Sequence, residues 1–296
     1  MEGVINVYKE PGWTSSDVVN KLKGVLHERH IGHGGTLDPA AEGVLPVCVG
    51  RATKLFDYLT AFHKIYLAHV VFGKTTDTQD GAGTVLSEAS PDFTEEQLRE
   101  TLNAFVGEIE QIPPMYSALH VDGQRLYDLA RQGKSVDLAP RKVTVLSVEM
   151  ASPLKDYECD LRIVCCKGTY IRTICHDLGQ KLGCGAYMAH LLRESAAGFD
   201  VKNAKTIPEL IDLMQTDDRS FLHPIEDVLW FMPALVLPIS QKKKLDNGIN
   251  PPLSEAGVPS ENAAFYRVYC ENTFYGIGEI REKSIKLLCR LGGDNL

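Results

Sequence analysis

The feature that most limits how this chain can fold is the segment of residues 32–46, Gly-His-Gly-Gly-Thr-Leu-Asp-Pro-Ala-Ala-Glu-Gly-Val-Leu-Pro. Three glycines among its first four residues allow sharp bends and close approach of another molecule. Asp38 precedes Pro39 and is therefore held in an extended or turn conformation. Because an apolar strand is expected at Val44–Val49, the segment is predicted to be a bent loop fixed to a sheet. It presents the Asp38 carboxylate beside His33, although an Asx-type turn without a chemical role fits most Asp-Pro pairs.

Hydrophobic periodicity elsewhere predicts a mixed α/β architecture. Ile65–Phe72 is apolar at nearly every position, which is typical of a strand in the centre of a sheet. Ser15 or Ser16 is expected to cap the first helix. Further strands are predicted at Val4–Tyr8, Val143–Met150 and Cys159–Cys166, and helices at 15–26, 54–62, 94–106, 125–132, 169–182 and 206–232.

The chain is predicted to contain two domains. Pro233 and Pro238 flank the expected boundary, which separates a large domain of residues 1–235 from a small β unit of residues 236–296. Three strands are expected in this unit, at Phe265–Cys270, Phe274–Ile280 and Ile285–Leu288. A polar, basic excursion at 120–142 interrupts the larger domain.

The net charge of −8 is unevenly distributed. Residues 76–120 carry nine acidic groups and one basic group, and residues 206–235 carry six and one. The remaining stretches are slightly basic, which permits an RNA partner without requiring one.

Several classes of site are disfavoured by the sequence. It has no GxGxxG, GxxxxGK[ST] or GxSxG motif, and its eight cysteines form no CxxC pair. We therefore expect neither a cofactor nor a metal. The N-terminal residues do not resemble a signal peptide, no apolar run is long enough to span a bilayer, and the cysteines are typical of a reduced protein, so a cytoplasmic location is expected.

A lone carboxylate can act as a nucleophile or base when a cation orients it. Arg172 is the best candidate, because it is predicted in the first turn of a helix, where the helix dipole disfavours a cation and an acidic partner would compensate. An arginine that extends to solvent fits equally well. Tyr66 lies on the predicted central strand, where a core tyrosine is the simpler interpretation, and His33 could contact a nucleic acid or only its own loop.

The string GHGGTLDPAAEGVLPVCVGRATK, residues 32–54, closely resembles the signature of the TruB family, the bacterial tRNA pseudouridine-55 synthases. The matches follow family order over roughly residues 3–200, while the last 60 or so residues resemble a PUA-type RNA-binding domain. Other segments that carry the resemblance are Lys9–Ser15, Gln111–Ala118, Val121–Tyr127 and Lys167–Arg172.

This resemblance implies a pseudouridine-synthase fold, with a mixed, largely antiparallel central sheet and a PUA-like C-terminal domain. The implied reaction converts a flipped-out uridine of the tRNA T-loop to pseudouridine without cofactor or metal. Asp38 matches the catalytic aspartate, Tyr66 the active-site tyrosine that stacks on the base and helps deprotonate C5, and Arg172 the arginine paired with the aspartate. Residues at matching substrate-binding positions are Lys9, His33, Tyr170 and Leu191.

The polar excursion at 120–142 resembles the family's mobile thumb. Leu191-Leu192-Arg193-Glu194 departs from the commoner Leu-Arg-Arg, which predicts one weaker RNA contact. The expected partner is the T-arm of tRNA, bound by a monomer without a guide RNA. Two alternatives stay open: a guide-RNA-dependent synthase of the dyskerin type, and an RNA-binding module in which catalysis is secondary. The route at the glycosidic bond, attack on C1′ or formation of a glycal, also stays open.

Overall fold

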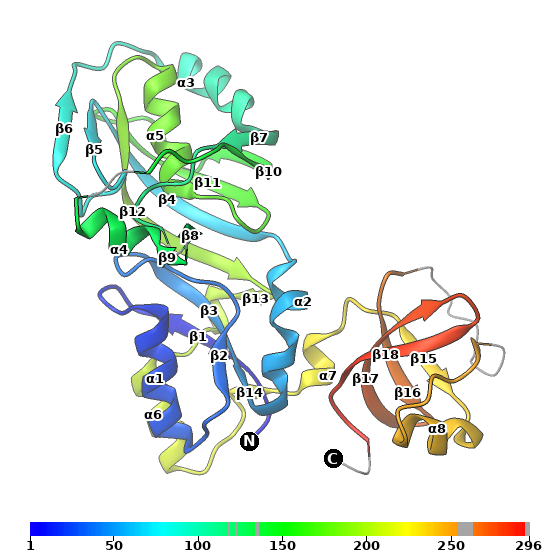
Figure 1. The fold of residues 1–296 in the computed structure, drawn as a ribbon. Coiled ribbons are helices and arrows are strands. Elements are labelled where there is room, and N and C mark those ends of the chain that lie inside the picture. The colour runs from blue at the N-terminus through cyan, green and yellow to red at the C-terminus, as the bar shows by residue number, and fades with distance from the viewer. Residues whose placement is uncertain (118, 122, 134–135, 254–262, 294–296) are drawn as a thin grey trace.

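A computed structural model describes residues 1–117, 119–121, 123–133, 136–253 and 263–293 of the chain. Two bodies form an L-shaped outline, a large α/β domain and a small β domain set to one side of it (Figure 1). The mixed α/β fold expected from the sequence is confirmed.

A mixed sheet forms the centre of the large domain, and in the described residues it has ten strands. Adjacent strands are antiparallel except β3 and β12, which are parallel. In spatial order the strands are β14 (Leu222–His223), β1 (Gly3–Lys9), β3 (Glu42–Val49), β12 (Ala186–Ala196), β4 (Lys64–Phe72), β11 (Glu158–Cys165), β10 (Arg141–Met150) and β7 (Gly107–Gln111), with β13 (Phe199–Asp200) beside β12 and β2 (Ile31–His33) beside β3.

The helices and the smaller sheets complete the two domains (Figure 1). The helices are α1 (Ser15–Leu26), η1 (Gly50–Leu55), α2 (Phe56–Thr60), α3 (Glu95–Leu102), η2 (Asn103–Phe105), α4 (Leu126–Arg131), α5 (Ile171–Lys181), η3 (Val201–Asn203), α6 (Ile207–Gln215), α7 (Ile225–Val228), η4 (Ile239–Gln241) and α8 (Lys242–Asp246). The remaining strands are the hairpins β5 (Lys74–Thr76) with β6 (Val85–Glu88) and β8 (His120–Val121) with β9 (Gln124–Arg125), and the C-terminal sheet β15 (Ala234–Leu237), β16 (Tyr266–Cys270), β17 (Thr273–Arg281) and β18 (Ser284–Arg290).

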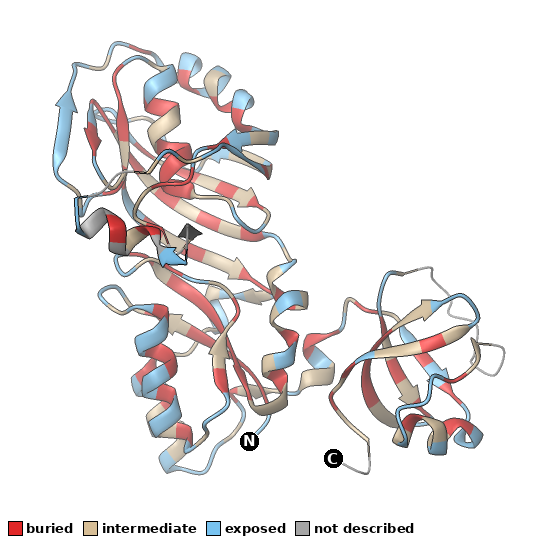
Figure 2. Ribbon diagram, viewed as in Figure 1, coloured by how far each residue is buried: buried red, intermediate tan, exposed pale blue. Residues whose placement is uncertain are grey.

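Two apolar clusters build the core of the large domain, one for each half of the sheet. Helices α1 and α6 pack on β1, β2 and β3, whereas α3 and α5 pack on β4, β10, β11 and β12. Buried and less buried residues alternate along β4, as expected for a strand with one face in the core (Figure 2). The predicted central position of this strand is confirmed, since β4 lies between β11 and β12.

The start of α1 differs from the prediction. Thr14, not Ser15 or Ser16, caps the helix, in a reciprocal capping box with Asp17. The Ser15 hydroxyl instead accepts a hydrogen bond from the backbone N–H of Leu37 and donates one to its carbonyl, at 2.9 and 3.2 Å. Ser15 therefore connects α1 to the loop that carries Asp38.

The predicted helix over 206–232 is also wrong in part. Helix α6 ends at Gln215, Asp217 adopts a positive φ of 57°, and β14 comes before the short helix α7. A non-glycine residue in the left-handed region does not continue an α-helix, and the acidic composition of the segment gave no sign of this turn.

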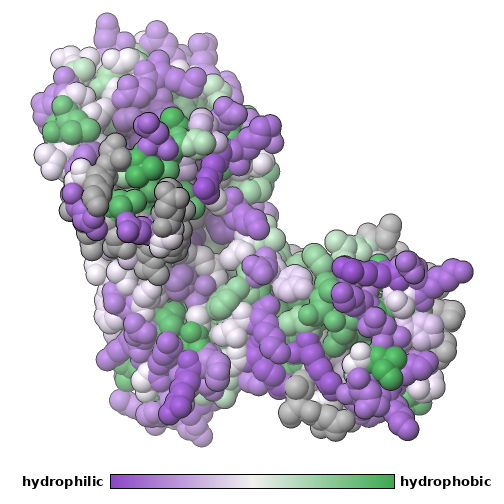
Figure 3. All heavy atoms as spheres, viewed as in Figure 1, coloured by the Kyte–Doolittle hydropathy of each residue, from purple (hydrophilic) through white to green (hydrophobic). Residues whose placement is uncertain are grey.

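The small domain begins slightly before the predicted boundary, because β15 starts at Ala234 and pairs in parallel with β16. Ile277, Cys289 and Leu291 of this domain share an apolar cluster with Val4 and Cys48 of the large sheet. Green, hydrophobic spheres gather where the two bodies meet (Figure 3). The two domains are therefore packed against each other. Within the described ranges, every helix is too short or too polar to span a bilayer.

Candidate active site

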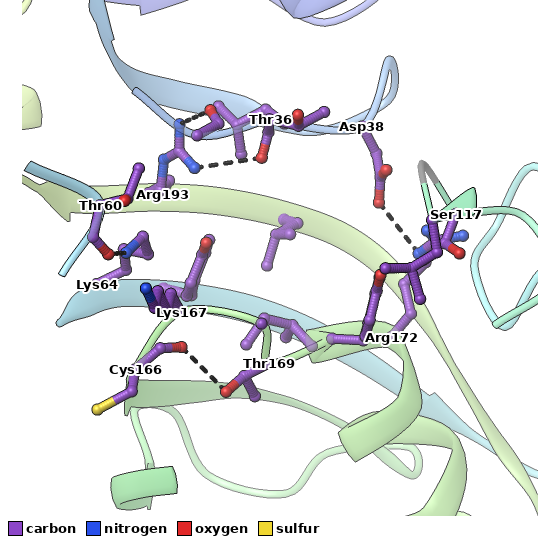
Figure 4. A pocket seen from close by; sticks show the side chains of 18 residues that line it. Thr36, Asp38, Thr60, Lys64, Ser117, Cys166, Lys167, Thr169, Arg172 and Arg193 are labelled. Carbon is purple, nitrogen blue, oxygen red and sulfur yellow. Dashed lines mark hydrogen bonds and ion pairs between the residues drawn. The ribbon is translucent and has the colours of Figure 1, made fainter. Parts of the chain in front are cut away.

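A cavity of about 330 Å³ opens where the two halves of the sheet meet (Figure 4). The loop between β2 and β3 forms one wall, and β4, β12 and the start of α5 form the others. Its lining includes Lys64 and five of the residues that the sequence predicted for the site: Asp38, Tyr66, Tyr170, Arg172 and Leu191.

The loop that carries Asp38 is fixed by hydrogen bonds from several parts of the chain. Arg193 is 1% exposed, and its guanidinium donates to the carbonyls of Gly35, Thr36 and Val44 at 3.1, 3.3 and 2.7 Å. Gly35 has a φ of +126°, a backbone conformation that side chains rarely adopt. The Asp38 carboxylate is thus presented on a rigid platform, as the glycines predicted.

Lys9 holds the same loop from beneath. Its side chain is fully buried, and Nζ donates to the carbonyls of Glu10, Pro39 and Ala41 at 3.0, 3.2 and 2.6 Å. Burial lowers the pKa of Lys9 to about 8, although the nearby Asp38 carboxylate opposes this. Lys9 does not line the cavity described above. It also does not line a second, larger cavity beside it, which His33 lines. The expected direct contact with substrate is therefore replaced by a structural role in positioning the loop.

Arg172 connects three segments of the site. Its Nε lies 3.0 Å from Oδ2 of Asp38, and Nη1 lies 3.4 Å from Oδ2 of Asp80. Nη1 also donates to the Thr78 carbonyl at 3.2 Å, and Nη2 to the Tyr116 carbonyl at 2.9 Å. The side chain is only 5% exposed, so the predicted pairing with Asp38 is present and the solvent-exposed alternative is wrong.

Asp80 is a second carboxylate that the sequence analysis missed. Its Oδ1 accepts hydrogen bonds from the Thr78 hydroxyl and the Ala82 N–H, at 2.6 and 3.1 Å, which hold its other oxygen toward Arg172. Burial raises the pKa of Asp38; Arg172 opposes this rise, and Asp80 adds to it. The carboxylate of Asp38 is therefore more basic than an ordinary aspartate while it stays oriented by the guanidinium.

Tyr66 forms the floor of the cavity from β4. It is 7% exposed, and burial raises the pKa of its hydroxyl, an effect that the positive charge of Arg193 opposes. Leu191 on the adjacent strand β12 lies opposite Ala68 and also lines the cavity. An aromatic ring and an aliphatic side chain thus give the cavity an apolar interior suited to a flat ring.

Tyr170 immediately precedes α5, and its backbone is held by the amide of Gln111. The Tyr170 N–H donates to Gln111 Oε1 at 3.0 Å, and its carbonyl accepts from Nε2 at 3.1 Å. Gln111 is itself 2% exposed. This buried amide was not singled out from the sequence, because a glutamine before two prolines gives no local sign of such a contact.

His33 does not line the catalytic cavity but a larger one beside it, of about 770 Å³. Burial lowers the pKa of the imidazole, and the charge of Arg193 lowers it further, so His33 is neutral at neutral pH. Its Nδ1 is buried and has no hydrogen-bond partner among the described residues. Asp38 and Arg172 line both cavities, so His33 lies in the space next to the catalytic centre.

The excursion at 120–142 begins beside this larger cavity. Its predicted helix is present as α4, and Leu126 and Leu129 are buried. The Tyr127 N–H donates to the Ser117 carbonyl at 3.2 Å. The side chains of Arg125 and Arg131, and residue Lys134, lie outside the described part of the chain, so the resemblance of this excursion to a mobile thumb stays a prediction.

Comparison with known proteins identifies the family. The N-terminal domain of TruB family pseudouridylate synthases matches residues 23–171, and the tRNA pseudouridylate synthase B C-terminal domain matches residues 172–230. The chain belongs to the TruB family of pseudouridylate synthases. It is therefore an isomerase, and the resemblance stated from the sequence motifs is confirmed.

Curated TruB relatives cover most of the chain. A protein named tRNA pseudouridine synthase B from Clostridium kluyveri is 39% identical over 291 residues, which is 97% of this chain and 99% of that protein. A protein of the same name from Streptococcus pyogenes serotype M2 is 42% identical over 255 residues, 84% of this chain and 87% of that protein.

Solved structures show the same fold at lower identity. A chain of a Cbf5–Nop10–Gar1 complex superposes with a TM-score of 0.76 at 24% identity, covering 98% of this chain and 84% of that chain. A chain from an H/ACA RNP bound to a substrate RNA containing 2′-deoxyuridine gives a TM-score of 0.74 at 21% identity, covering 97% and 84%. These similarities confirm the pseudouridine-synthase fold expected from the sequence.

Proposed function

We propose that the protein isomerises uridine 55 in the T-loop of tRNA to pseudouridine, with Asp38 acting at the glycosidic bond. One observation carries this proposal: an oriented carboxylate, 3.0 Å from a buried guanidinium, faces a cavity with a tyrosine floor. The curated relatives named tRNA pseudouridine synthase B support tRNA as the substrate.

The size of the cavity supports base flipping. A volume of about 330 Å³ suits one nucleoside rather than a folded RNA loop, so the target uridine must leave its stack. Flipping costs a few kcal/mol, and stacking on an aromatic side chain returns about 1–3 kcal/mol per base. Tyr66 provides the ring for this stacking, and Leu191 and Tyr170 enclose the base.

The chemistry breaks one bond to the ribose and forms another. The N1–C1′ bond breaks while Asp38, kept in place by Arg172, acts at the ribose. The detached uracil rotates inside the cavity, and C5 then bonds to C1′. The C5 proton leaves with help from the Tyr66 hydroxyl, and N1 gains a proton, so that the product is an isomer of the substrate. Both routes left open by the sequence, attack on C1′ and glycal formation, require an ionised Asp38 at this position.

We further propose that the enzyme works as a monomer in the cytoplasm, without a guide RNA. None of the eight cysteines forms a disulfide and seven of them are buried, as is typical of a reduced compartment. In this proposal, His33 helps hold the flipped conformation of the RNA and the PUA-like domain binds tRNA beyond the T-loop.

The proposal is tested with a tRNA transcript that lacks all modifications. Purified protein is incubated with the transcript alone, and pseudouridine is mapped at every uridine. We expect conversion at position 55 and nowhere else in the transcript. Conversion at another position would overturn the assigned site, and conversion only after a guide RNA is added would favour the dyskerin-type alternative.

A further inference from the structure

The two cavities described above share a boundary that the proposed mechanism does not fully use. Five residues line both of them: Thr36, Leu37, Asp38, Ser117 and Arg172. If the catalytic cavity holds the flipped uracil, the rest of the RNA chain lies in the larger cavity. The sugar that joins them must then lie at this shared boundary. This step rests on the proposed function.

Ser117 is the member of this set whose hydroxyl is buried yet has no partner among the described residues. The residue is 5% exposed, and its Oγ has no hydrogen-bond partner among the described residues. Its neighbour Tyr116 contributes a carbonyl to Arg172 at 2.9 Å, which places this segment against the guanidinium (Figure 4). A buried hydroxyl without a partner is unfavourable, so a ligand that supplies one is favoured.

The charges at the boundary indicate which part of a nucleotide Ser117 meets. Asp38 and Asp80 face the single guanidinium of Arg172, and all three line the larger cavity. His33, on the same cavity, is neutral because burial lowers its pKa. Two carboxylates against one cation disfavour a phosphate in contact with this side chain. A neutral hydroxyl group is therefore the better partner.

Within an RNA chain the 3′ and 5′ oxygens of the sugar are esterified, and the 2′-hydroxyl is the one that stays free. We propose that the Ser117 hydroxyl hydrogen-bonds the 2′-hydroxyl of the target uridine and so selects a ribonucleotide at this position. The 2′-hydroxyl is both donor and acceptor and is the group by which proteins distinguish RNA from DNA. Ser117 is thus a specificity-determining residue rather than a catalytic one.

The test measures binding of two synthetic T-arm hairpins that differ only in a ribo- or 2′-deoxyuridine at the target position. Both are titrated against full-length Asp38→Asn protein, which is expected not to turn over, with and without Ser117→Ala. We expect Ser117→Ala to weaken binding of the ribo hairpin about five- to tenfold and that of the deoxy hairpin less than twofold. The preference for ribose therefore falls by at least about 2.5-fold. Equal weakening of both hairpins, or of neither, would overturn the proposal.

Two controls separate recognition from structure. Ser16→Ala removes an exposed hydroxyl that lines the larger cavity alone, and should leave the ribose preference unchanged. The melting temperature of the free Ser117→Ala protein should be unchanged or higher, since the hydroxyl has no partner to lose; a lower one would indicate a structural serine. Conversion of the ribo hairpin by the unmutated protein tests the proposed function separately. If the unmutated protein converts this hairpin and Ser117→Ala still keeps the full preference for ribose, only the role proposed for Ser117 is refuted.

Discussion

Replacement of Arg172 by lysine should preserve the charge of the site and remove its geometry. The guanidinium reaches four acceptors on three segments, at 3.0 Å to Asp38, 3.4 Å to Asp80, 3.2 Å to the Thr78 carbonyl and 2.9 Å to the Tyr116 carbonyl. A lysine ammonium donates from a single nitrogen and cannot span these positions. Arg172→Lys should therefore leave Asp38 ionised but poorly oriented.

The magnitude follows from the hydrogen bonds that a lysine at this position cannot make. Each hydrogen bond to a charged group is worth about 1.5–3 kcal/mol, so loss of two would cost about 3–6 kcal/mol without relaxation. Because the charge is kept and the side chain can shift, we expect the free energy of unfolding to fall by about 1–3 kcal/mol. A displacement of the carboxylate by about 1 Å lowers turnover by about 100-fold. The guanidinium is buried, so the Kd for tRNA should change less than about threefold.

Single-turnover release of tritium from the uridine C5 position of tRNA, at saturating enzyme, measures the chemical step, and filter binding measures the Kd. Arg99→Lys is a matched control, because Arg99 forms an exposed ion pair with Glu95 on α3 and should affect neither quantity. A single-turnover rate for Arg172→Lys within threefold of that of the unmutated protein would show that the four-acceptor geometry of the guanidinium is unimportant.

Three further changes test other parts of the site. Tyr66→Phe keeps the ring that stacks on the base and removes the hydroxyl. We therefore expect tRNA affinity to be retained while release of the C5 proton slows at least tenfold. Near-normal product formation would mean that Tyr66 only stacks on the base. Asp80→Asn removes a charge that raises the pKa of Asp38. The acid limb of the kcat/KM profile rises as Asp38 ionises, so this limb should move to lower pH. A limb that stays or moves to higher pH would contradict the coupling between Asp80 and Asp38. Arg193→Met removes the shared donor of three carbonyls, two in the loop (Gly35 and Thr36) and one in β3 (Val44), at about 1–3 kcal/mol for each one that stays buried. Urea unfolding should show a loss of about 3 kcal/mol or more, and an unchanged midpoint would mean that the loop is fixed without Arg193.

Local patterns in the sequence predicted much of the site. The glycines, the Asp-Pro pair and the apolar strand after them predicted the loop of Asp38, and the placement of Arg172 at a helix start indicated an acidic partner. These features depend on neighbouring residues, so one sequence is enough to detect them. Lys9 was misjudged because a lysine is usually exposed, and its three carbonyl acceptors come together only in the folded loop.

The long-range parts of the site could not be predicted in this way. Strand β12 was missed because irregularities after Met188 and after Arg193 break its alternation, and because it buries the charged Arg193. Asp80 looked like part of a turn-rich loop, and its contact with Arg172 joins residues 92 positions apart. Such contacts have no local signature, since the partner that justifies a buried charge lies elsewhere in the chain.

In the proposed mechanism, the Asp38 carboxylate performs the chemistry and contributes little to binding. Asp38→Asn keeps the size of the side chain. For this variant, the Kd for unmodified tRNA and the single-turnover formation of pseudouridine are both measured, after mass spectrometry has excluded deamidation of Asn back to Asp. We predict a Kd within about tenfold of that of the unmutated protein and no pseudouridine formed during prolonged incubation. Substantial pseudouridine formation by this variant would show that a group other than the Asp38 carboxylate performs the chemistry.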